Sequence, residues 1–128
     1  MFEYVKNDTG NNFPLVKELK ATAGNYAVGD ALVLDSATGV LKPATGTVKP
    51  QYISAADKAV TEKDVLLAVN PVYAGQEWKA EFSVDGSAVK AGSAVTIDTT
   101  GKLITAATTG GVFTIIENLG TAAIGKFM

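Results

Sequence analysis

The residues of this chain that could do chemistry are carboxylates, lysines, hydroxyls and tyrosines, because the sequence contains no histidine and no cysteine. Nucleophile and base pairs that depend on an imidazole or a thiolate are therefore excluded. A pair of carboxylates could still hydrolyse a glycosidic bond. The candidates for such a pair are Asp30, Asp35, Asp85 and Asp98.

The sequence around these aspartates favours turns over catalysis. Asp35 and Asp98 each begin a segment that ends in a glycine, and Asp85 is followed directly by Gly86. An aspartate at the start of a turn accepts a hydrogen bond from the backbone N–H two residues later. The sequence therefore predicts no catalytic residues, and we expect that the protein is not an enzyme.

The sequence also lacks the motifs that bind metal ions or cofactors. Without cysteine or histidine the usual zinc ligands are missing, and no run of alternating acidic residues forms a calcium loop. The glycine-containing segment 108–111 is followed by strand-like residues, whereas a phosphate-binding loop is followed by a lysine and a helix. We expect no metal site and no cofactor.

One lysine, Lys58, lies in a short motif that indicates a different function. The tripeptide Asp57-Lys58-Ala59 resembles the segment around the modified lysine of lipoyl domains, which are small β-barrels with an internal repeat. The resemblance implies a carrier domain modified at Lys58. In that family the lysine lies at the tip of a tight hairpin, but the residues on either side of Lys58 lack the apolar alternation of two strands. A lipoyl-type carrier is kept as an alternative, and an exposed loop lysine is the simpler interpretation.

The segment 76–84 predicts a half-buried strand. Its apolar and polar side chains alternate, so that Trp78 and Phe82 belong to one face and Lys79 to the other. Trp78 and Phe82 could form a platform for a sugar, which would make the chain a surface carbohydrate-binding module. Their spacing favours burial in the core.

The composition predicts one small domain. The chain has 128 residues, of which 47% are hydrophobic and 19% charged, a size that suits one domain with one core. Its 11 basic residues are all lysines and its net charge is −2, which argues against nucleic-acid binding. It contains no run of ~20 apolar residues and does not begin with a signal-peptide pattern, so we expect no membrane contact and synthesis in the cytoplasm.

Regularly spaced turn residues predict an all-β fold, a small barrel or sandwich. Residues 28–44 and 91–106 repeat one pattern, which predicts an internally repeated β-hairpin. In each copy two alternate apolar residues face the core, a glycine adopts a positive φ in the turn, and a leucine returns to the core. These residues are Leu32, Leu34, Gly39 and Leu41 in the first copy, and Val95, Ile97, Gly101 and Leu103 in the second. Further strands are predicted at 64–69, 112–117 and 122–127, and segment 52–63 alone has some helical character.

The first 23 residues do not follow this pattern. We expect residues 1–23 to form an extended N-terminal arm and residues 24–128 to form the barrel, with a first edge strand as the alternative reading of the arm. Apolar residues that lie outside a barrel are exposed to solvent unless a partner protein covers them. The predicted partner contacts are therefore Phe2, Tyr4, Phe13 and Leu15.

The order of several segments resembles that of the small decoration, or cement, proteins of tailed-bacteriophage capsids. The segments are Tyr26–Leu34, Gly39–Ala44, Tyr52–Ala55, the strand around Trp78, and Gly111–Glu117. The resemblance implies a β-tulip or β-barrel domain, often a homotrimer, that lies on the outer capsid surface of the virion. It implies that the partner is the major capsid protein, whose subunits the domain bridges to stabilise the mature head, without an enzymatic role.

Overall fold

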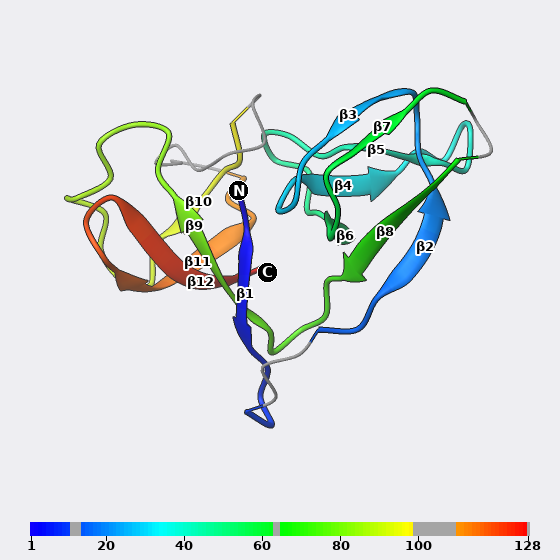
Figure 1. Cartoon of the computed structure of the whole chain (residues 1–128). Helices are drawn as coiled ribbons and strands as arrows, with labels where there is room; N and C mark the ends of the chain where they lie inside the picture. Colours follow the sequence, from blue (N-terminus) through cyan, green and yellow to red (C-terminus); the bar gives the residue numbers. More distant parts are fainter. Residues whose placement is uncertain (11–13, 63–64, 99–109, 128) are drawn as a thin grey trace.

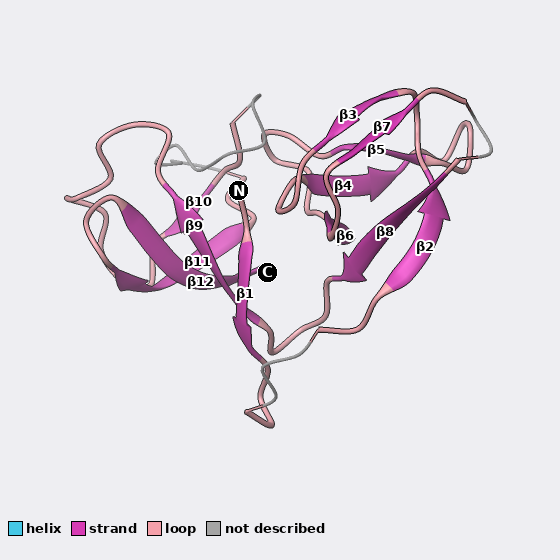
Figure 2. Cartoon of the chain, viewed as in Figure 1, coloured by secondary structure: helices cyan, strands magenta, loops and turns pink. Residues whose placement is uncertain are grey.

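Every element of regular structure in the described part of the chain is a β-strand (Figure 2). The computed structural model describes residues 1–10, 14–62, 65–98 and 110–127. The all-β prediction is therefore confirmed. The helical character expected within 52–63 is wrong, because this segment contains the strands β6 (Tyr52–Ser54) and β7 (Lys58–Val60).

The strands form three antiparallel sheets, which we call A, B and C. Sheet A has the order β1 (Glu3–Lys6), β9 (Glu77–Glu81), β12 (Ala122–Phe127), β11 (Phe113–Asn118) and β10 (Ala94–Val95). Sheet B has the order β2 (Lys17–Lys20), β8 (Leu66–Pro71), β6, β4 (Ala31–Leu34) and β5 (Leu41–Pro43). Sheet C pairs β3 (Gly24–Tyr26) with β7. Figure 1 shows sheet A as one lobe, and sheets B and C as a second lobe.

The described residues contain two core clusters rather than the single core expected from chain length. The cluster of the sheet A lobe is rich in aromatic rings, and the cluster of the other lobe is mainly aliphatic. Strand β4 takes part in both, since Ala31 belongs to the first cluster and Leu32 to the second. Successive side chains of a strand point to opposite faces, so β4 is covered on both sides and joins the lobes into one unit.

The first copy of the repeated hairpin is confirmed. Strands β4 and β5 pair with Leu34 opposite Leu41, and in the turn Asp35 accepts hydrogen bonds from the backbone N–H groups of Ala37 (3.0 Å) and Gly39 (2.7 Å). Gly39 has the expected positive φ of 74°. Leu32 and Leu41 are buried, whereas Leu34 is 38% exposed because it is the last residue of β4, next to the turn.

The second copy is described only in its first half. Val95 and Ile97 are buried as predicted, and each is 1% exposed. Ile97 and Gly46 exchange two backbone hydrogen bonds, of 2.6 and 3.1 Å, which tie the second copy to the segment that follows the first. The predicted turn glycine Gly101 and the returning Leu103 lie outside the described residues.

Gly39 offers a direct test of the turn. An added Cβ at Gly39 meets no atom within 4 Å, so Gly39→Ala places alanine in a left-handed backbone without a clash. We expect the free energy of unfolding to fall by about 1 kcal/mol. Gly39→Asn should recover much of this loss, because asparagine tolerates the same backbone region. Urea denaturation of the three proteins measures the difference, and an unchanged midpoint for Gly39→Ala would contradict the turn.

The predicted N-terminal arm is corrected to two edge strands. Strand β1 pairs with β9, with Tyr4 opposite Trp78, and β2 pairs with β8, with Leu19 opposite Leu67. These strands therefore complete sheets A and B at their edges. The alternative reading of a first edge strand is the one that the structure supports.

Candidate interaction surface

Three of the four aspartates considered for catalysis, Asp30, Asp35 and Asp85, accept hydrogen bonds within turns. Asp30 accepts a hydrogen bond from the N–H of Ala27 (2.9 Å), and Asp85 accepts one from the N–H of Ser87 (3.0 Å). The bonds from the Ser87 backbone and hydroxyl lower the pKa of Asp85. Asp35 caps its hairpin turn and pairs with Lys42 at 3.6 Å, and Asp98 follows the bridge at Ile97. Within the described residues no three acidic side chains gather as a metal site would require.

Lys58 does not lie at a hairpin tip. It begins β7, where Tyr26 of β3 is its partner, and its Nζ donates a hydrogen bond to the carbonyl oxygen of Leu66 at 2.7 Å. The preceding Asp57 accepts a bond from the N–H of Val28. Lys58 is exposed, as a modified lysine would have to be, but it lies at the start of a strand and not at the hairpin tip that the lipoyl resemblance implies.

Trp78 is buried, as its spacing predicts, and is 1% exposed. It lines a hollow of about 570 Å³ together with residues of both sheets, including Ile53 and Asn70 of sheet B. Among the described residues, its indole N–H is the one buried side-chain donor or acceptor without a hydrogen-bond partner. An aromatic platform for a sugar requires an exposed ring, which Trp78 does not offer.

The four predicted contact residues have different positions. Phe2 is a core residue, 3% exposed, with its ring centroid 4.8 Å from that of Phe127. Its expected role as an exposed contact is therefore corrected. Tyr4 is half-buried against Trp78, and burial raises the pKa of its hydroxyl. Leu15 is 63% exposed, and Phe13 lies outside the described residues.

Tyr4 and Leu15 come together at the vertex where the lobes meet. The chain crosses between sheets A and B twice here, from β1 to β2 and from β8 to β9 (Figure 1). Between these crossings is a hollow of about 380 Å³ that Tyr4, Leu15 and Tyr73 line together. Leu15 and Val16 are each 63% exposed and Tyr73 is 50% exposed. We call Tyr4, Leu15, Val16 and Tyr73 the vertex surface.

Two largely buried amide side chains fix the shape of the vertex surface. The amide of Asn70 donates to the carbonyl oxygen of Leu15 at 2.9 Å. Gln76 accepts a hydrogen bond from the N–H of Tyr73 at 2.7 Å and donates to the carbonyl oxygen of Pro71 at 3.2 Å. Asn70 and Gln76 are 9% and 6% exposed. The exposed apolar side chains are thus held on an ordered backbone.

Sequence reasoning missed Val16 and Tyr73. Val16 follows Leu15 directly. Its exposure depends on the position of β2 at the edge of sheet B, which the sequence alone does not indicate. Tyr73 lies between the predicted strands 64–69 and 76–84, so an aromatic residue in a short connection was the available signal. Buried polar residues flanking an exposed aromatic are a signal for an ordered loop.

No protein-family model, curated protein or solved structure matches the chain. In the described ranges no helix is long and apolar enough to cross a membrane. The case for a function therefore rests on the residues and geometry of the chain itself.

Proposed function

We propose that this protein is a structural module that binds the outer surface of a phage capsid and stabilises the mature head by bridging capsid subunits. The observation that carries the proposal is the vertex surface, where Leu15, Val16 and Tyr73 are each at least half exposed on a backbone held by buried amides. An ordered, exposed apolar patch is a feature of protein interaction sites. The partner on this proposal is the major capsid protein, and the location is the virion surface.

The chemistry of the chain supports a binding role. The sequence offers neither histidine nor cysteine, and three of the four candidate aspartates, Asp30, Asp35 and Asp85, accept hydrogen bonds within turns. The sequence segments whose order resembles that of decoration proteins contain the strands β4, β5, β6, β9 and β11. A lipoyl carrier or a carbohydrate-binding module receives less support, given the surroundings of Lys58 and Trp78.

The proposal is tested by cosedimentation of the purified protein with expanded, empty capsids of a phage that encodes it. We expect saturable binding to expanded capsids and greater resistance of the decorated heads to heating. Absence of binding would overturn the proposal. A mass increase at Lys58 after incubation with lipoyl ligase, or selective binding on a glycan array without capsid binding, would replace it with one of the alternatives.

The vertex surface makes a specific prediction for capsid binding. Leu15→Ser removes an apolar side chain that is 63% exposed, so stability should change by less than about 0.5 kcal/mol. Binding should weaken at least about tenfold, since a central apolar contact is lost. Leu66→Ser is the matched control, because Leu66 is 40% exposed on β8 and does not line the vertex hollow. Equal binding by both variants would place the contact elsewhere.

A further inference from the structure

A basic groove adjoins the vertex surface at one end of sheet B, and Tyr73 lines both the vertex hollow and the hollow of this groove. Here β2 and β6 begin and β8 ends, so segments far apart in sequence converge in an antiparallel sheet. They enclose a hollow of about 640 Å³ whose charged side chains are Lys17 and Lys49. Within the described ranges neither lysine forms an ion pair, and no acidic residue lines the hollow. We call Lys17, Lys49 and Tyr52 the basic groove.

Apolar surface accompanies these positive charges. Val33 lines the hollow and also lines a neighbouring hollow with Leu34 and Val48. Leu34 and Val48 are 38% and 45% exposed. The Lys42 ammonium in this second hollow is paired with Asp35, so Lys17 and Lys49 carry the net charge of the groove.

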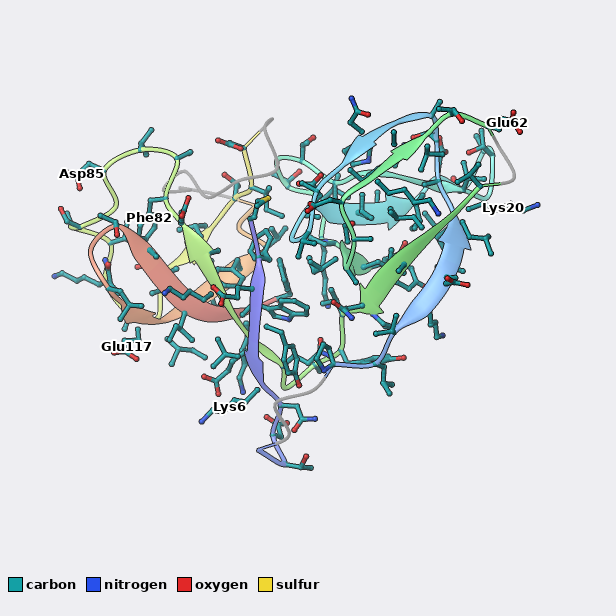
Figure 3. All side chains as sticks on the ribbon, viewed as in Figure 1. Lys6, Lys20, Glu62, Phe82, Asp85 and Glu117 are labelled. Carbon is teal, nitrogen blue, oxygen red and sulfur yellow. The ribbon has the colours of Figure 1, made fainter. Side chains whose placement is uncertain are left out.

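An acidic tip lies on the other lobe. Asp85 and Glu117 are exposed on the side of the sheet A lobe away from β2, where Figure 3 shows Asp85 at the upper corner and Glu117 at the lower corner of the lobe. A β-bulge in β11 leaves both Ile116 and Glu117 exposed instead of alternating in and out. Asn118 ties the two segments of the tip together, because its amide donates to the carbonyl oxygens of residues 86 and 89 at 2.9 and 2.6 Å.

The tip combines negative charge with apolar surface. Val84, Ile116 and Leu119 are 55%, 44% and 45% exposed. Neither Asp85 nor Glu117 forms an ion pair with another described residue. Lys90 is exposed in the same loop and reduces the negative charge of the tip without reversing it. We call Val84, Asp85, Ile116, Glu117 and Leu119 the acidic tip.

We infer that the acidic tip of one copy of this chain docks in the basic groove of another copy. Each surface offers two charges without ion-pair partners, of opposite sign, beside exposed apolar side chains. Complementary charge selects the partner and its orientation, while burial of the apolar side chains supplies affinity. The occupant is a second copy because the same chain carries both complementary surfaces.

The two surfaces are different, so the contact is heterologous and each copy can bind one neighbour with its tip and another with its groove. Repetition of such a contact closes into a ring or extends into a filament. A ring of three agrees with the homotrimer expected of a decoration protein. The inference rests on the proposed function in this respect, since a ring could present several vertex surfaces to the capsid together.

Charge reversal tests this inference by sedimentation velocity on the full chain at several protein concentrations. Wild type should form an oligomer, and both Lys17→Glu/Lys49→Glu and Asp85→Lys/Glu117→Lys should weaken association at least about a hundredfold. The variant that combines all four substitutions keeps the net charge of wild type and restores opposite charges across the contact. It should associate as wild type does.

Lys6→Glu/Lys58→Glu is the matched control, since it lowers the net charge as much as the groove variant does but leaves the groove and the tip intact. It should remain oligomeric. Circular dichroism establishes that each variant is folded. A monomeric wild type, oligomeric double variants, or a folded fourfold variant that stays monomeric would each overturn the inference. Capsid cosedimentation is measured separately, so an oligomer that does not bind capsids would overturn the proposed function alone.

Discussion

Replacement of Phe2 by alanine is expected to destabilise the protein by about 3–5 kcal/mol, although Phe2 is the second residue of the chain. Its ring is buried against those of Phe113 and Phe127, with centroid separations of 5.5 and 4.8 Å. Its N–H also donates to the carbonyl oxygen of Gly29 at 2.9 Å, which holds β1 in place. Small domains are stable by only about 5–15 kcal/mol, so this loss is a large fraction of the total.

Urea denaturation followed by fluorescence measures the effect, because Trp78 is the only tryptophan and is buried. Phe2→Leu keeps much of the volume and should cost less than about 1.5 kcal/mol. Leu15→Ala is the exposed control and should cost less than about 0.5 kcal/mol. If Phe2→Ala left the midpoint unchanged while weakening partner binding, the first residues would form an arm after all.

The sequence predicts a strand correctly where apolar and polar side chains alternate clearly within the strand itself. In β9 the alternation is clean, and Trp78 and Ala80 are each 1% exposed while Lys79 and Glu81 are exposed, as expected. The turn at Asp35 is predictable for the same reason, since its chemistry lies within five residues. Such features require no knowledge of distant partners.

The pairing of β1 and β2 depends on distant residues and could not be read from the N-terminal segment. Tyr4 is opposite Trp78 and Leu19 is opposite Leu67, and nothing local in residues 1–20 indicates these partners. The helical expectation for 52–63 failed similarly, because Tyr52 and Lys58 are held in strands by sheets formed elsewhere in the chain. Tertiary context overrides weak local preference in such short segments.

The candidate site was predictable only in part. Leu15 and Tyr4 were identified from their apolar character in a segment without a clear role, and they line one hollow. Phe2 shares that character but faces inward, since the aromatic cluster of sheet A needs its ring. The groove around Lys17 and Lys49 depends on the convergence of three strand ends, so single-sequence reasoning had no access to it.

Gly125→Ala is expected to be the most disruptive small substitution in sheet A. Gly125 is buried in β12, between Ile115 of β11 and Trp78 of β9. A Cβ added there would overlap the carbonyl oxygen of Thr114 and the ring of Phe113. Backbone cannot yield as a flexible side chain can, so we expect a loss of about 3 kcal/mol or more in the free energy of unfolding.

Gly39→Ala is the matched control for this prediction, because it is the same chemical change at a site where the added Cβ meets nothing. Its cost of about 1 kcal/mol comes from the backbone alone. The excess loss for Gly125→Ala in urea denaturation therefore measures the overlap with β11. Because β12 also carries Phe127, a shift of this strand would loosen the ring that packs against Phe2, and the near-ultraviolet circular dichroism should weaken as well. Equal losses for the two variants would show that β12 has room to move, and would contradict the tight packing of the aromatic cluster.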